Sequence, residues 1–123
     1  MKIVNPKMVV EREIDGYKFK VGIIPFGKKT EIEAVAFFSG KVETPEQVEN
    51  LVKQGYQYVK YGIKGHTGLR FDESSEEVPF TQDSDGSVSE ETMAVYAASP
   101  GLLAKLSAAV TELNYLKKES AKN

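Results

Sequence analysis

Polar and apolar residues alternate in two short runs near the N-terminus, which is the pattern of half-buried β-strands. Residues 9–14 and 17–24 are rich in β-branched and aromatic side chains. Between them stands Asp15-Gly16, a dipeptide that tolerates the positive φ angles of a two-residue hairpin turn. Every second residue from Tyr17 to Ile23 is apolar, so one face can be buried while lysines keep the other face in water. The sequence therefore predicts a β-hairpin.

Residues 30–39 fit two patterns. Ile32, Val35 and Ala36 have helical spacing, whereas residues 31–34 alternate as a strand would. We favour a short helix here and leave the strand open as the alternative.

The strongest helix pattern covers residues 45–62. Thr44 can cap this helix, Pro45 suits its first position, and Gln47 completes a capping box. Apolar residues then recur with helical spacing at Val48, Leu51, Val52, Tyr56, Val59 and Ile63. Gly55 and Gly62 fall on the same side, where each costs about 1 kcal/mol of helix propensity; this indicates that another element packs unusually close there. Residues 65–69 are expected to turn the chain out of the helix.

Residues 72–87 are polar and acidic, and only Val78-Pro79-Phe80 interrupts them. A segment of this composition buries little apolar surface, so we expect a mobile surface loop. Ser89 is expected to cap the helix that follows, with acidic residues near the positive end of the helix dipole and Val88 placed to pack against Met93.

The last helix, which follows Ser99-Pro100, has a broad apolar face with spacings of three and four residues. This face must be buried, and we expect the core of the same domain to take most of it. Part of the same surface can instead serve self-association or capture an amphipathic helix of a partner. The candidate residues for such binding are Leu102, Leu106, Ala109, Val110, Leu113 and Leu116.

Together these elements predict an α+β fold in a single domain, residues 1–123. A hairpin and connecting segment (1–43) precede a bundle of three to four helices with an acidic loop (44–118), and a short tail (119–123) frays. The composition, 41% hydrophobic and 28% charged, is typical of one soluble domain with a modest core. Because there is no cysteine, no disulfide or thiol nucleophile is expected. No signal peptide or run of about 20 apolar residues is found, so we expect no membrane partner.

Charge is distributed unevenly along the chain. Residues 1–70 carry twelve Lys and Arg against eight Asp and Glu, whereas residues 71–104 carry eight acids and no base. In the first part the two signs alternate and do not form the one-sided basic stripe that binds phosphates. We therefore expect no nucleic-acid partner.

Residues 22–30 have the glycine spacing and the lysine of a phosphate-binding loop, but they lack one required residue. Lys29 stands where the magnesium-binding hydroxyl must follow the first lysine, and Thr30 comes one position late. A strand end followed by a turn is the preferred interpretation.

Two further candidates for site chemistry are incomplete. Residues 81–86 resemble part of a calcium loop, but threonines replace the first carboxylate and the bidentate glutamate. His66 is the only histidine and lies in a glycine-rich segment, so a hydrogen bond in a turn is expected of it and not catalysis. The sequence therefore predicts no enzyme, metal site or cofactor.

Four segments carry a resemblance to a known family. They are residues 58–69 (Tyr-Val-Lys-Tyr-Gly-Ile-Lys-Gly-His-Thr-Gly-Leu), residues 77–80 (Glu-Val-Pro-Phe), the helix start Ser89-Glu90-Glu91, and the helix from Ser99-Pro100-Gly101-Leu102 to Lys118. In this order they resemble the small tail assembly chaperones of long-tailed, lambda-like bacteriophages. Members of that family often show a helix ending in a Gly-Leu turn, a variable acidic loop with a Val-Pro-Phe step, and two closing helices. The resemblance covers the chain from Thr44 onward and rests on the order of elements.

The resemblance implies a non-enzymatic protein of the host cytoplasm that is absent from the mature virion. Such a protein binds the tape measure protein and keeps it soluble until the tail tube polymerises, because long apolar stripes otherwise aggregate. It also implies an extended form, made by a programmed frameshift, that recruits the tail tube protein. Lys117-Lys118 is compatible with a slippery message, although the protein sequence favours an ordinary pair of lysines at a helix C-terminus.

Two other classes of protein stay open. One is a different phage structural protein, such as a tail completion or head-to-tail joining subunit, whose hairpins pair around a ring. The other is a small nucleotide-binding or regulatory module built on residues 22–30.

Overall fold

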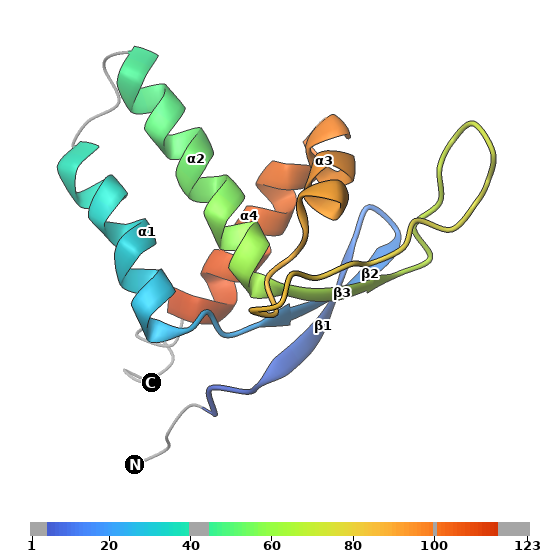
Figure 1. The fold of residues 1–123 in the computed structure, drawn as a ribbon, viewed down its shortest axis with the longest axis horizontal. Helices are drawn as coiled ribbons and strands as arrows, with labels where there is room; N and C mark the ends of the chain where they lie inside the picture. The colour runs from blue at the N-terminus through green and yellow to red at the C-terminus, as the bar shows by residue number, and fades with distance from the viewer. Residues whose placement is uncertain (1–4, 40–44, 100, 116–123) are drawn as a thin grey trace.

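The computed structural model describes residues 5–39, 45–99 and 101–115. An antiparallel three-stranded sheet of order β1-β2-β3 carries the helices on one side, so the chain has the predicted α+β architecture (Figure 1). The elements in chain order are β1 (Val9–Ile14), β2 (Tyr17–Gly22), α1 (Phe26–Ser39), α2 (Pro45–Gly62), β3 (Ile63–Thr67), α3 (Glu90–Ala98) and α4 (Leu102–Tyr115). Thr44 and the tail 119–123 lie outside the described residues.

β1 and β2 form the predicted hairpin. Its two turn residues, Asp15 and Gly16, have φ angles of 54° and 84°, the positive values that a tight two-residue turn requires. Phe19 and Val21 of β2 are fully buried, while the lysines between and beside them are exposed. The predicted alternation of a buried and a wet face is therefore confirmed from Lys18 to Val21, whereas Tyr17, expected on the buried face, is 37% exposed.

Residues 30–39 are helical, which confirms the favoured prediction. They belong to a longer helix, α1, that begins at Phe26 directly after Pro25. The amide of Lys29 donates to the Pro25 carbonyl at 2.9 Å, so the turn expected after the strand is instead the first turn of α1. Ile32 is 4% exposed and anchors this helix in the core.

The two glycines of α2 lie where α4 approaches, as their position predicts. A Cβ atom added to Gly62 would stand 2.4 Å from Cγ1 of Val110, and one added to Gly55 would stand 3.3 Å from Oγ of Ser107. Only a residue without a side chain lets the two helices come this close at Gly62.

Residues 63–67 form the strand β3, where the sequence predicted the helix end and a turn. Phe19 pairs with His66 and Val21 with Ile63, and a bulge lies between the two pairs. Ile63 is fully buried. The physical reason is that β1 pairs with only one edge of β2. The other edge is open to residues 63–67, and pairing there gives hydrogen-bond partners to their backbone N–H and C=O groups, which no longer have partners within α2. The expected change of direction comes later, at Gly68, whose φ is 83°.

Ser89 caps α3 as predicted. Its Oγ accepts a hydrogen bond from the amide of Thr92, and its φ and ψ of −67° and 160° are those of an N-cap residue. Val88 and Met93, on either side of the cap, are both fully buried in the core. This agrees with the packing expected across the start of the helix.

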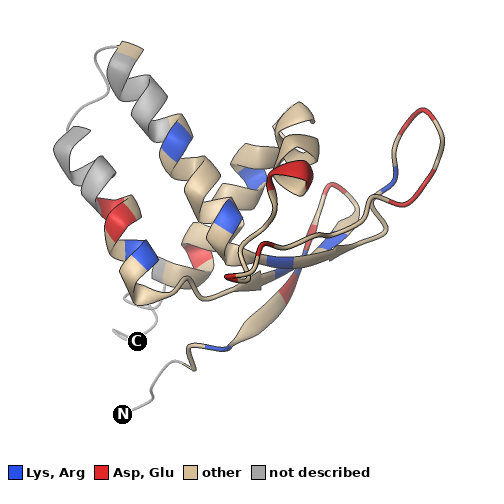
Figure 2. Ribbon diagram, viewed as in Figure 1, with Lys and Arg blue, Asp and Glu red and all other residues tan. Residues whose placement is uncertain are grey.

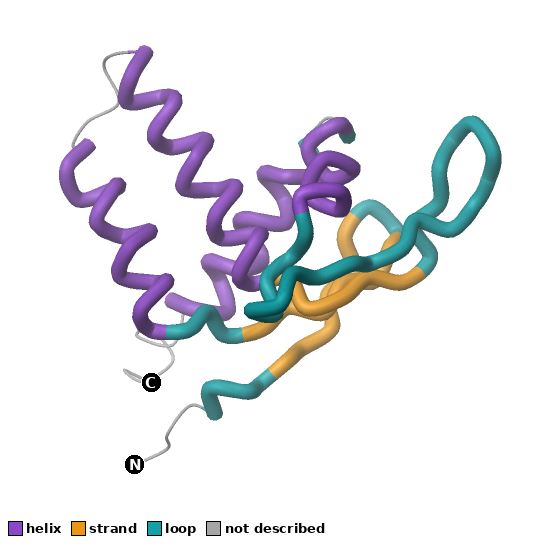
Figure 3. Tube along the Cα trace, viewed as in Figure 1, coloured by secondary structure: helices purple, strands orange, loops and turns teal. Residues whose placement is uncertain are grey.

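Two hydrogen-bonded turns stand where one acidic loop was expected (Figure 3). The first, residues 69–78, is called the arm below. Its two legs are joined by hydrogen bonds from Val78 N to Leu69 O (2.8 Å) and from Phe71 N to Glu76 O (2.9 Å). The second, residues 82–88, is called the acidic turn. Most side chains of both turns are exposed, but Val78 and Ser87 are 3% and 2% exposed, so the segment does contribute to the core.

Candidate functional site

The predicted binding face of α4 is divided between the core and the surface. Four of its six residues, Leu102, Leu106, Val110 and Leu113, are at most 9% exposed and belong to the hydrophobic core. Ala109 is half-buried against the same core, and Leu116 lies outside the described residues. These four leucine and valine side chains therefore belong mainly to the core that holds this domain together.

An open apolar groove lies beside this face, between α2 and α4, and is called the α2–α4 groove. Its volume is about 490 Å³. It is lined by Val52 and Gly55 of α2, Ala97 at the end of α3, and Leu103, Ala104 and Ser107 of α4, together with the residues of the α3–α4 junction. No charged side chain lines it among the described residues.

The groove owes its depth to small side chains. Gly55 and Ser107 meet at its floor, and Ala97 and Ala104 leave its walls low. Val52 also lines the groove and is 60% exposed, so its side chain is accessible to a partner. The groove can therefore receive apolar side chains of an amphipathic helix.

Sequence reasoning missed Val52 and Ala104 as surface residues. Val52 belongs to the apolar repeat of α2, which predicts burial, and Ala104 lies outside the predicted binding face of α4. Gly62 is the signal that could have distinguished the core face of α4 from the groove. Val110 contacts α2 at Gly62, so the face of α4 that carries Val110 lies in the core, and the neighbouring face, with Leu103, Ala104 and Ser107, lines the groove.

His66 joins β3, the arm and α3. Its Nδ1 lies 2.6 Å from the hydroxyl of Tyr96, and its Nε2 lies 2.7 Å from the carbonyl oxygen of Val78. Because a carbonyl only accepts, Nε2 carries the proton, and the Tyr96 hydroxyl donates to Nδ1. Burial raises the pKa of Tyr96, which keeps this donor protonated. Both ring nitrogens are thus engaged in holding the fold, which agrees with the hydrogen bond expected of His66 but places it in a strand and not in a turn.

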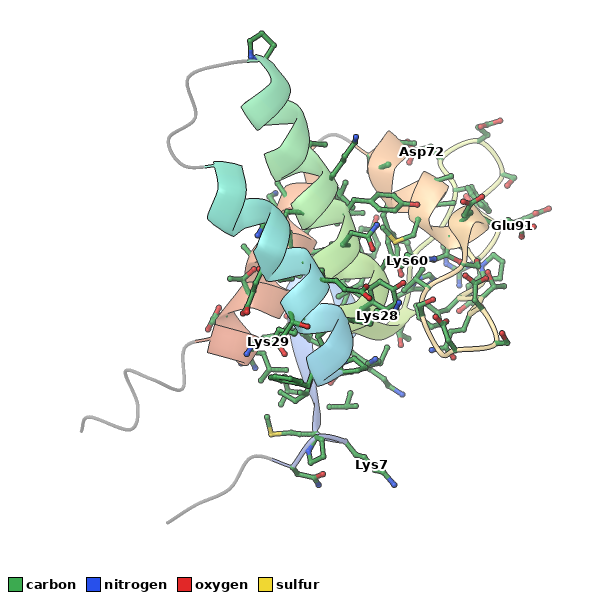
Figure 4. All side chains as sticks on the ribbon, turned by 60° about the vertical axis from the view of Figure 1, so that its left-hand side comes forward. Lys7, Lys28, Lys29, Lys60, Asp72 and Glu91 are labelled. Atoms are coloured by element: carbon green, nitrogen blue, oxygen red, sulfur yellow. The ribbon has the colours of Figure 1, made fainter. Side chains whose placement is uncertain are left out.

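The segment that resembles a phosphate-binding loop is connected to the C-terminal end of α4. The Ile24 amide donates to Oδ1 of Asn114 at 2.9 Å, and Pro25 has no amide hydrogen. Lys29 reaches the carbonyl of Asn114 at 3.5 Å, while Lys28 pairs with Glu31. Figure 4 shows Lys28 and Lys29 on the first turn of α1. Two groups of this segment, the Ile24 amide and the Lys29 ammonium, are therefore engaged within the fold.

The acidic turn is tied to α2 by Lys60. Its Nζ donates to Oδ2 of Asp83 at 3.2 Å and to the carbonyl of Val88 at 2.7 Å. Asp85 accepts hydrogen bonds from the side chain and the amide of Ser87, which lower the pKa of its carboxyl. In the described part of the chain, no group of three or more His, Cys, Asp or Glu side chains could hold a metal ion.

Comparisons with protein-family models, with characterised proteins and with solved structures found no match to this chain. Among the described helices no single one is long and apolar enough to cross a membrane, although the bent pair α3 and α4 meets that test of length and composition when taken together.

Proposed function

We propose that this chain is a non-enzymatic tail assembly chaperone of a long-tailed bacteriophage, which acts in the host cytoplasm and binds the tape measure protein through the α2–α4 groove. The observation that carries the proposal is this groove: it lies beside two helices, its described lining holds no charged side chain, and Val52 in it is 60% exposed. The order of elements from Thr44 onward, which resembles that family, supplies the identity of the partner.

A groove of this kind suits the physical task. A tape measure is long and helical, and its apolar stripes attract one another before tube protein surrounds them. A helix placed in the α2–α4 groove covers such a stripe, while the acidic surface of the arm and of α3 stays in water (Figure 2). Several copies along one tape measure gain in total affinity from multivalency, and side-by-side copies can associate with one another. The proposal includes an extended, frameshifted form that recruits tail tube protein.

Co-expression with the tape measure protein of the same phage tests the proposal. The expected result is that the tape measure stays in the soluble fraction only when this chain is present, and that the two proteins copurify. Val52→Asp places a charge in the apolar groove and is expected to return most of the tape measure to the pellet. Val9→Asp is the matched control, because Val9 is also an exposed valine (47%) but lies on β1.

Three results would overturn the proposal. They are a tape measure that is equally insoluble with and without the chain, a Val52→Asp variant that works as well as Val9→Asp, and recovery of this chain from purified virions. The coding sequence near Lys117-Lys118 tests the extended form, which requires a slippery heptamer and an overlapping reading frame.

A further inference from the structure

A second groove lies on the other side of α3, between the arm, the tip of the β1–β2 hairpin and the start of α4. Its volume is about 540 Å³, within the size range of ligand pockets, and it is called the arm groove. Its floor is apolar, because Leu69, Val78 and Leu102 reach it from the core and Val95 of α3 lies beside them. The α2–α4 groove and the arm groove share Ser99 and otherwise have different lining residues.

Aromatic side chains stand at the edge of this apolar floor. Tyr17 of the hairpin and Phe71 of the arm both line the groove, and each is 37% exposed. Tyrosine and phenylalanine are enriched at protein interfaces, where a large apolar surface is covered by a partner. An apolar floor with aromatic walls is suited to an apolar side chain of a protein segment.

The rim of the groove is acidic. Three acids, Asp15, Asp72 and Glu73, line it together with one basic residue, Arg70. Asp15 already forms an ion pair with Lys105 at 2.6 Å, whereas no ion pair of Asp72 or Glu73 is found among the described residues. The one basic residue of the arm, Arg70, donates to the carbonyl of Ser75 within the arm itself.

The surroundings extend this negative charge. Residues 71–104 contain eight acids and no base, and Figure 2 shows these acids along the arm and at the start of α3. A partner that carries basic residues beside its apolar ones is therefore attracted to the rim, and an acidic partner is repelled.

We propose that the arm groove binds a basic amphipathic segment of another protein, with an apolar side chain on the floor and Lys or Arg side chains against Asp72 and Glu73. The hydrogen bonds between its legs hold the arm in one shape, and Val78, which is buried and bonded to His66, attaches it to the rest of the fold. This surface is distinct from the proposed site for the tape measure, so either proposal can fail while the other holds.

Binding of two synthetic peptides tests the inference. One is a fluorescent amphipathic peptide of about 15 residues made of Leu and Lys, and the other has Glu in place of every Lys, so that both share the same apolar positions. The Leu–Lys peptide is expected to bind the full chain, and its affinity is expected to fall as the salt concentration rises from about 50 to about 500 mM. The Leu–Glu peptide is expected not to bind. Equal binding of both peptides would overturn the proposal.

Two pairs of variants locate the binding site. Asp72→Asn with Glu73→Gln is expected to weaken binding by about tenfold, since each surface ion pair contributes roughly two- to fivefold. Glu76→Gln with Glu77→Gln removes the same charge from the same arm outside the groove and is expected to change affinity less than twofold. If the two double variants weaken binding equally, the affinity depends only on the net charge of the protein, and the proposed site is wrong.

The second pair fills the groove. Ala98 is an exposed wall residue, so Ala98→Trp occupies the space above the floor and is expected to abolish most binding. Ala108→Trp, at an exposed alanine of α4 outside both grooves, is the matched control. Unchanged binding by Ala98→Trp would also overturn the proposal, and the charge variants test it independently should that protein fold poorly.

Discussion

Replacing Gly62 by alanine puts a methyl group into the closest contact between α2 and α4. The new Cβ would stand 2.4 Å from Cγ1, 2.8 Å from Cγ2 and 3.1 Å from Cβ of Val110. Carbon atoms attract best at about 3.5–4.0 Å, so all three contacts are repulsive. Val110 is fully buried, and a rotation about χ1 relieves one methyl while leaving its Cβ in place. The variant therefore requires the two helices to move apart.

The expected cost of Gly62→Ala follows from two opposing terms. Overpacking a core costs about 1–3 kcal/mol, and overlap with a branched, immobile side chain belongs at the upper end. Alanine regains less than about 1 kcal/mol of helix propensity, because Gly62 is the last residue of α2. The net loss is about 2 kcal/mol. With an unfolding entropy of about 0.26 kcal/mol/K for 123 residues, the melting temperature falls by about 8 °C.

Urea and thermal denaturation followed by circular dichroism measure this loss. Gly55→Ala is the matched control on the same face of the same helix. Its Cβ would stand 3.3 Å from the rotatable hydroxyl and 3.7 Å from Cβ of Ser107, so the gain in helix propensity of up to about 1 kcal/mol should prevail and stability should not fall. Val110→Ala alone leaves a cavity, but in the double variant the Gly62→Ala methyl partly fills it, so the two changes should couple favourably by about 1 kcal/mol or more. A neutral Gly62→Ala variant, or strictly additive effects, would refute the close contact.

Three further changes test other parts of the fold. Tyr96→Phe removes the donor to Nδ1 of His66 and should cost about 1 kcal/mol, with faster hydrogen exchange at Val78 as the sign that the arm has loosened. Ser89→Ala removes the cap of α3 and should cost about 1 kcal/mol in urea denaturation. Burial lowers the pKa of Lys64, so the folded chain releases this proton before the unfolded chain does, and stability from this group rises as pH rises towards 10.5. Lys64→Met should therefore show a smaller rise in stability over that alkaline range, and equal pH slopes would contradict the burial.

Local signals predicted the elements that depend on neighbouring residues. Asp15-Gly16 fixed the hairpin turn, and Ser89 fixed the start of α3, because each acts on backbone groups within a few residues. The glycines of α2 also predicted a contact with a distant segment. Their unfavourable helix propensity indicated that another element packs close to them, and that element is α4. Such signals work when one physical requirement admits few residue types.

Contacts between distant segments could not be read in the same way. Ile63 continues the apolar repeat of α2, so the helical pattern includes it, but its backbone pairs with Val21 of a strand far earlier in the chain. Pairing of this kind depends on which sheet edge is free and close, which periodicity does not record. His66 likewise looks like a turn residue until Tyr96 and the arm are brought beside it.

The same limit explains why the predicted binding face of α4 lies in the core. Periodicity shows that one side of the helix is apolar, but the angle at which α2 meets α4 decides which residues that contact covers. Because Gly62 lets α2 reach Val110, the core takes Leu106 and Val110, and the open surface begins at Leu103 and Ala104.

The two proposed binding surfaces share one wall, and this decides which variants can separate them. Ser99, at the end of α3, lines both grooves, while Ala97 lines only the α2–α4 groove and Ala98 only the arm groove. A tryptophan at position 98 that shifts the end of α3 would therefore disturb both surfaces. Val52 lines only the α2–α4 groove and Asp72 only the arm groove, so Val52→Asp should impair tape measure binding alone, and neutralising Asp72 with Glu73 should impair peptide binding alone. Loss of both activities in either variant would mean that the two grooves act as one site.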